Sequence, residues 1–148
     1  MSTAPTFVQP VTRAMQRMLL AASVLVFIAG VQTFVLTEHT DRFFAWTIKA
    51  PITAAFLGAG YWAACVLEAL AARERVWANA RASVPAIWIF TTLTSIATLI
   101  HRDIFRTDSV WAWAWFAIYV RVPVMLGVIW IQQMRVPGGD PPRSAPRP

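Results

Sequence analysis

Two short stretches of the sequence combine residue types that bind metals. They read "HTDRF" at 39–43 and "HRDIF" at 101–105, and they hold the two histidines of the chain. In each, an aspartate follows the histidine by two residues. Imidazole and carboxylate groups suit zinc, iron, manganese or copper, and two imidazoles alone can hold a haem iron. The candidate metal or haem ligands are therefore His39, Asp41, His101 and Asp103.

A structural interpretation competes with this ligand hypothesis. Residues two apart point to opposite sides of a helix, so H-x-D binds one ion only where the backbone is extended or in a loop. Short polar residues also cap helices. Asp108 directly precedes an apolar run and is well placed to cap it, while Asp41 or Asp103 can cap a short turn.

Four apolar segments flank these polar stretches and must position them. They cover 18–36, 46–67, 83–100 and 110–131, and each is close to the roughly 20 residues that a helix needs to cross hydrocarbon about 30 Å thick. Apolar residues make up 57% of the chain and charged ones 14%, too few to cover a soluble globule. The sequence predicts an all-α membrane protein, with four transmembrane helices in a compact bundle over 13–135. Disordered tails are expected at 1–12 and at the Pro-rich 136–148.

The basic residues predict an orientation. If both termini are cytoplasmic, that side carries eight of them: Arg13, Arg17, Arg73, Arg75, Arg81, Arg135, Arg143 and Arg147. The other side carries four, namely Arg42, Lys49, Arg102 and Arg106. This bias follows the positive-inside rule and puts both H-x-D stretches on the outer face. Scattered between apolar runs, these charges do not predict nucleic-acid binding.

The tryptophans agree with this topology, because their amphipathic rings favour membrane interfaces. Four fall at the predicted outer ends of helices: Trp46, Trp111, Trp113 and Trp115. Two fall near the inner ends, namely Trp77 and Trp130. All six are expected in interfacial belts.

Arg121 is a charge inside the fourth apolar segment, about 9 Å beyond Trp115 along a helix. A charge there costs about 2.5 kcal/mol or more, so it usually has a partner in the bundle interior. The predicted partners are a bound anion, a lipid headgroup, the Tyr119 carbonyl that Pro123 leaves free, or a carboxylate of Asp41, Asp103 or Asp108. The alternative is that the side chain extends to the outer interface.

Two further charged residues are candidates. Lys49 stands in "KAP" as Arg121 stands in "RVP", and each triplet follows an H-x-D-x-F stretch and a tryptophan. This suggests a loose internal repeat, although the basic residue follows the histidine by ten residues in the first half and by twenty in the second. A basic residue of this kind could pair with a haem propionate. Glu68, near the inner end of the second segment, is expected to pair locally with Arg73 or Arg75, with a proton relay as the alternative.

Small residues mark the second apolar segment as a packing helix. Within "TAAFLGAGYWAA", Ala54 and Gly58 and also Gly60 and Ala64 are four apart. Such pairs allow close backbone approach. We expect this helix to pack centrally, or to mediate self-association or contact with other membrane proteins in the bilayer.

Three stretches carry a family resemblance: "TDRFFAWTIKAPITAAFLGAGYWAA" (40–64), "ATLIHRDIF" (97–105) and "AWAWFAIYV" (112–120). They resemble a group of bacterial four-helix integral membrane proteins to which no activity is assigned. The resemblance implies this topology and a multi-pass place in a bacterial-type plasma membrane. It implies no catalytic or binding residues.

The loops are too short for an elaborate active site, and the sequence contains no P-loop, GxGxxG or H-E-x-x-H motif. We therefore expect a non-catalytic accessory or interaction subunit. One alternative is a haem- or metal-binding redox protein with its site at the two H-x-D loops. The other is an oligomeric transporter or channel for small solutes.

Overall fold

The computed structural model describes residues 7–141, and within them the chain is built from helices. Four are long and apolar enough to cross a membrane, so the coarse fold prediction is confirmed. They are α1 (Arg13–Gly30), α3 (Pro51–Arg73), α5 (Ser83–Ile100) and α6 (Val110–Met134). A π-helical turn, η1 (Val31–Val35), extends α1. The shorter helices are η2 (Thr37–His39), α2 (Thr40–Phe43), α4 (Trp77–Ala80) and η3 (Arg102–Ile104).

Capping residues set the starts of the long helices. The Thr12 hydroxyl accepts a hydrogen bond from the Met15 amide, so α1 begins several residues before its apolar run. Pro51 occupies the first turn of α3, which therefore starts later than the apolar run from Trp46. Ser109, whose hydroxyl accepts from the Trp111 amide, caps α6. The prediction that Asp108 caps this helix was wrong by one residue.

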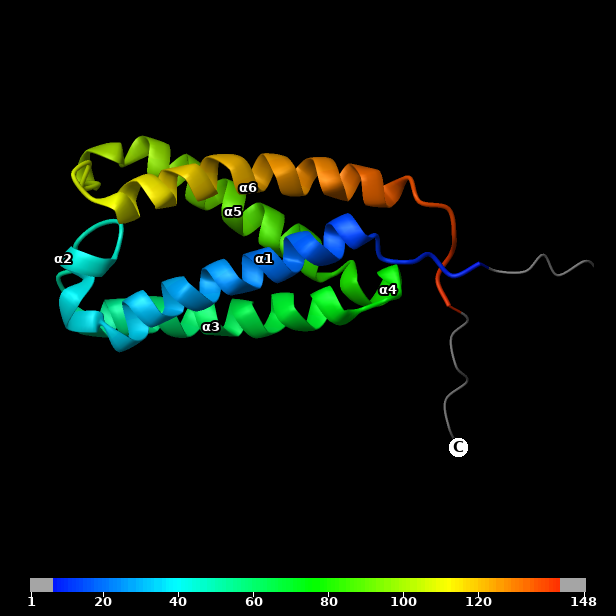
Figure 1. Cartoon of the computed structure of the whole chain (residues 1–148), viewed down its shortest axis with the longest axis horizontal. Helices are drawn as coiled ribbons and strands as arrows, with labels where there is room; N and C mark the ends of the chain where they lie inside the picture. The colour runs from blue at the N-terminus through cyan, green and yellow to red at the C-terminus, as the bar shows by residue number, and fades with distance from the viewer. Residues whose placement is uncertain (1–6, 142–148) are drawn as a thin grey trace, which may run out of the picture.

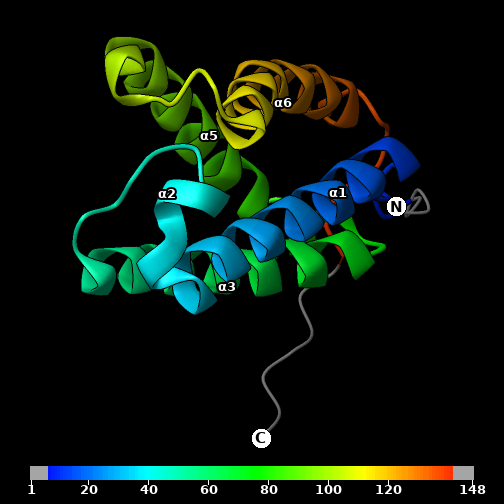
Figure 2. The same ribbon diagram turned by 60° about the vertical axis from the view of Figure 1, so that its left-hand side comes forward.

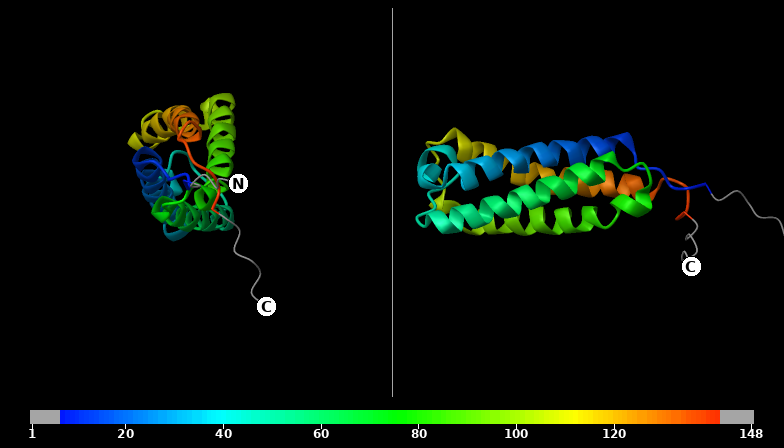
Figure 3. Two further views of the ribbon diagram at one scale, coloured as in Figure 1. Left: turned by 90° about the vertical axis from the view of Figure 1, so that its right-hand side faces the viewer. Right: turned by 90° about the horizontal axis from the view of Figure 1, so that it is seen from below.

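The four long helices form two antiparallel hairpins (Figures 1 and 2). One hairpin pairs α1 with α3 and the other pairs α5 with α6, and both are closely packed. Fewer contacts join α1 to α6 and α3 to α5, so the helices form a ring in the order α1, α3, α5, α6 (Figure 3). Both described chain ends lie at one end of this bundle, which we name the terminal end. The opposite end, with residues 36–50 and 101–109, is the far end.

Glycines bring α1 and α3 into close contact. A Cβ atom on Gly58 would lie 2.6 Å from the backbone nitrogen of Phe34, and one on Gly30 would lie 2.2 Å from the Trp62 ring. The predicted close backbone approach is thus confirmed at Gly58, with η1 as the neighbour, and Ala54 is buried on the same face of α3. Gly60, by contrast, is exposed. Self-association through that side of α3 stays a prediction.

Hydrogen bonds join three segments across the terminal end, namely 7–12, 74–81 and 133–140. We name these segments together the terminal layer. The buried Gln133 side chain accepts from the Thr12 amide at 2.8 Å and donates to the Pro10 carbonyl at 2.9 Å. The Trp77 amide donates to the Gln9 carbonyl, and Arg81 pairs with Asp140 at 2.9 Å. Residues 7–12 and 136–141 therefore have defined places where we expected disorder. The remaining tail positions, 1–6 and 142–148, lie outside the described residues.

Aromatic side chains fill the far half of the bundle. The Trp115 ring lies 4.2 Å from that of Tyr119 and 5.3 Å from that of Phe44, and its indole nitrogen donates to the Thr98 hydroxyl at 3.0 Å. Trp115 is only 7% exposed, and Trp77 at the terminal end only 3%. These two rings are core residues, so placing them in the interfacial belts was wrong.

Candidate binding cavity

A cavity of about 200 Å³ lies between the two hairpins. One wall comes from α1 and η1, through residues such as Val26 and Gln32. The opposite wall comes from the first half of α6, which places Trp115 and Tyr119 against the space. The lining is mostly apolar and aromatic, which is the usual character of a small-molecule site.

The cavity is long and reaches the molecular surface. On α6 its lining runs from Trp111 to Val122, a rise of about 16 Å along the helix. Ile28 and Trp111 line it and are also partly exposed, at 44% and 36%. A neighbouring surface hollow shares Ile28, Gln32 and Trp111 with the cavity. A ligand therefore has a lateral route between α1 and α6, from the side that faces lipid when the four helices span a membrane.

Glu68 is the acidic residue of the cavity wall. Its side chain is 3% exposed, and its Oε2 atom is buried without a hydrogen-bond partner among residues 7–141. None of the described residues that line the cavity is basic. A buried carboxyl group without a partner is costly, and inside a membrane such a group is a functional candidate.

Two polar groups of the cavity wall are committed elsewhere. Thr91 donates its hydroxyl hydrogen to the Ile87 carbonyl at 2.9 Å. The Trp115 indole nitrogen donates to the Thr98 hydroxyl. Neither group bonds to Glu68, whose Oε2 atom is available to a ligand.

The expected local pairing of Glu68 with Arg73 or Arg75 is not formed. Both arginines are exposed, and the ion pairs among residues 7–141 are Arg81–Asp140 and Arg106–Asp108. The reason is the position of Glu68 around the helix axis. It follows the buried Ala54 and Tyr61 at steps of seven residues, which puts all three on the packed face of α3. That spacing was the sequence signal for its burial.

The predicted metal ligands do not assemble. His39 and His101 are exposed, as is Asp103, and none of the three hydrogen-bonds through its side chain within 7–141. In the part of the chain described, no three His, Cys, Asp or Glu side chains gather to hold a metal ion. Asp41 and Asp103 provide no helix cap either. Haem ligation by the two imidazoles stays a prediction, which an absorption spectrum of the purified protein tests.

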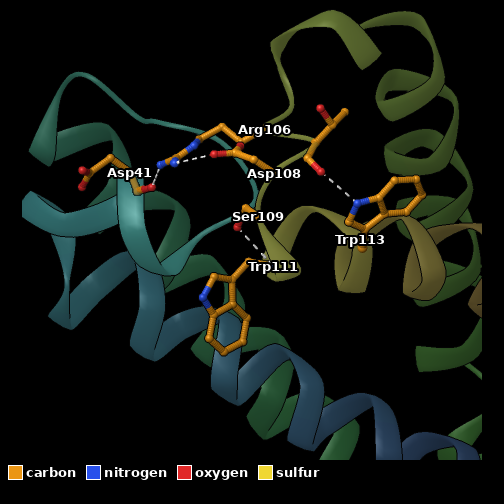
Figure 4. Close-up of polar contacts among 7 residues, drawn as sticks. Asp41, Arg106, Asp108, Ser109, Trp111 and Trp113 are labelled. Carbon is orange, nitrogen blue, oxygen red and sulfur yellow. Dashed lines mark hydrogen bonds and ion pairs between the residues drawn. The ribbon is translucent and has the colours of Figure 1, made fainter.

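Arg106 joins the two far-end loops instead (Figure 4). Its guanidinium donates to the main-chain carbonyl of Asp41 and pairs with the Asp108 carboxylate at 3.3 Å. The hydrogen bond from Arg106 lowers the pKa of the exposed Asp108 carboxyl group. Asp108 was among the carboxylates predicted to pair with Arg121, but it pairs with Arg106 instead.

Arg121 and Lys49 have no partner within residues 7–141. Lys49 is exposed in the loop before α3, and Arg121 is exposed on the outer surface of α6. Neither side chain takes part in an ion pair of the described residues. The Pro123 carbonyl accepts a hydrogen bond from the Trp88 indole nitrogen at 3.0 Å. This turn of α6 therefore packs against α5.

No family model, curated protein or solved structure matches this chain.

Proposed function

We propose that this chain is a non-catalytic, multi-pass membrane protein that binds a small, largely apolar molecule in the cavity between its hairpins. The observation that carries the proposal is an apolar cavity with one buried carboxyl group on its wall, Glu68, whose Oε2 has no partner in the described part of the chain. Such a site positions a ligand by shape and fixes it by one polar contact. With a single titratable carboxyl group, it suits binding better than acid–base chemistry.

The cavity volume limits the size of the ligand. An engineered apolar cavity of about 150 Å³ is known to bind benzene. At about 200 Å³, this cavity suits one aromatic ring or a compact aliphatic group with a short polar substituent. A whole lipid does not fit.

The orientation belongs to the proposal. The terminal end carries the larger share of basic residues, which places it in the cytoplasm by the positive-inside rule. The far end, the H-x-D loops and the lateral opening at Trp111 then lie toward the outer leaflet.

Filling the cavity should abolish binding. Ala114 lines it, so Ala114→Leu removes space that a ligand needs. We expect 2-phenylethanol to raise the unfolding temperature of the detergent-purified wild-type protein, since a ligand at 100 times its Kd stabilises by about 2.7 kcal/mol. Ala114→Leu should show no such rise. Ala97→Leu, an exposed alanine on α5, is the matched control and should behave as wild type. Equal responses in all three proteins would place the ligand elsewhere.

A second candidate function, an accessory subunit that docks against another membrane protein, is favoured by Arg121. It is the twelfth residue of the 25-residue α6, so it lies about 16 Å from the helix start, near the middle of the span. An exposed charge at that depth is costly unless something covers it. The only acidic residue in the four spans is the buried Glu68, so a second copy offers no carboxylate. The complementary partner is a different protein with a carboxylate in a transmembrane helix.

Arg121→Leu tests this second function. Because the side chain has no described partner in its own chain, the free energy of unfolding of the isolated protein should change by less than about 0.5 kcal/mol. Capture of a partner from native membranes should be lost, and Arg121→Glu should restore it when the partner's acidic residue is changed to arginine. Arg135→Leu, at the end of α6, is the control. A large loss of stability, or capture that ignores Arg121, would contradict the docking role.

A further inference from the structure

We propose that the ligand of the cavity is a compact organic cation, an ammonium group on an apolar body, and that Glu68 is its counter-ion. This inference rests on the proposed function and adds the chemical class of the ligand. It joins two observations, the Glu68 carboxyl group, whose Oε2 has no partner within residues 7–141, and the aromatic rings that line the same cavity.

The charge of the lining selects the sign of the ligand. Glu68 is the acidic residue among the described residues that line the cavity, and the exposed Arg73 and Arg75 do not pair with it. An ammonium group supplies the N–H donors and the positive charge that this carboxyl group lacks. A carboxylate or phosphate ligand would bring a like charge beside Glu68 and is disfavoured.

The aromatic rings favour a cation over a neutral polar group. Of the rings that line the cavity, Tyr119 is the deepest on α6, eight residues or about 12 Å beyond Trp111 at the opening, and its centroid is 4.2 Å from that of Trp115. The faces of such rings attract cations, and tryptophan does so most strongly. Since the Trp115 indole hydrogen is already donated to Thr98, its ring is held in place and only its π surface is left for the ligand.

The membrane setting favours an apolar body on that cation. A strongly hydrated ion such as sodium would lose its water among apolar walls, with few oxygen ligands in return. An alkyl or aryl ammonium instead buries its apolar part against residues such as Val26 and Ile118. Its nitrogen then reaches Glu68 at the deep end of the cavity.

A matched pair of probes tests the inference on the full-length protein in an uncharged detergent. Phenethylamine is a cation at neutral pH, and 2-phenylethanol is its neutral isostere. Titration calorimetry should give the amine a Kd about ten- to a hundredfold lower than that of the alcohol, the ratio expected of a charge-assisted hydrogen bond. In Glu68→Gln the two values should converge to within about threefold. Glu38→Gln removes an exposed carboxylate and should keep the wild-type ratio.

The outcomes separate the two proposals. Equal affinity of amine and alcohol for the wild-type protein would overturn the cation inference and leave cavity binding intact, and this comparison needs no variant to fold. A preference for the amine that survives Glu68→Gln would overturn the role of Glu68. Failure of both probes to bind the wild-type protein would overturn the proposed function itself.

Discussion

Replacing Gly58 by alanine is expected to lower the free energy of unfolding by about 2 to 3 kcal/mol, near the upper end for an overpacked core. The added methyl group would lie 2.6 Å from both the backbone nitrogen and the Cβ of Phe34, and 2.8 Å from the Thr33 hydroxyl oxygen. These atoms belong to the π-helical turn η1, whose backbone cannot rotate aside as a surface side chain does. The α1–α3 hairpin therefore has to separate, and unfolding of the purified protein in mixed detergent micelles measures the loss.

Gly60, two residues along the same helix, is the matched control. A Cβ atom there meets nothing within 4 Å. Gly60→Ala should leave stability unchanged or raise it by up to about 1 kcal/mol, because alanine favours the helix. Equal effects of the two changes would mean that α1 and α3 are not packed as closely as described above.

The opposite sign is expected at Glu68. Glu68→Leu should raise the free energy of unfolding by about 2 kcal/mol, since it replaces a buried carboxyl group, costly in the membrane, by an apolar side chain of similar size. The same change should abolish binding of phenethylamine. A gain in stability at the expense of binding is what a functional polar group in a core predicts.

Glu38→Leu provides the comparison, because Glu38 is exposed at the far end and its removal should change stability by less than about 0.5 kcal/mol. A Glu68→Leu protein that unfolds more easily than wild type would show that the carboxyl group has a structural partner in the folded chain. Glu68 would then not be free to act as a counter-ion.

The spans were predictable from sequence because hydrocarbon imposes a length on any helix that crosses it. The segment at 83–100 coincides with α5, and the fourth segment starts with α6 at Val110. The first two differ at their starts, which Thr12 and Pro51 decide. The order of the apolar runs also predicted two loops at one end of the bundle, and one loop with both termini at the other. These features depend on local sequence, so a single sequence is enough to predict them.

The site was not predictable in the same way. In lipid, both the packed and the outer face of a helix are apolar, so hydropathy does not separate them. For that reason we predicted that Trp115 is an interfacial ring, that Glu68 is a locally paired charge, and that Arg121 faces the interior. The H-x-D stretches were correctly placed at one end of the bundle. Their side chains were not, because a loop can turn each one outward.

The terminal layer has a mechanical consequence. It fastens both hairpins through contacts between residues more than 120 positions apart, such as Gln9 with Gln133. At the far end, Arg106 and packed aromatic rings do the joining, with Trp46 of one hairpin against Phe105 and Trp115 of the other. The two hairpins are therefore held by hydrogen bonds at one end and mainly by ring packing at the other, with the cavity between. Because packed rings can shift without breaking hydrogen bonds, small movements near the opening at Trp111 would let a ligand exchange without unfolding any helix.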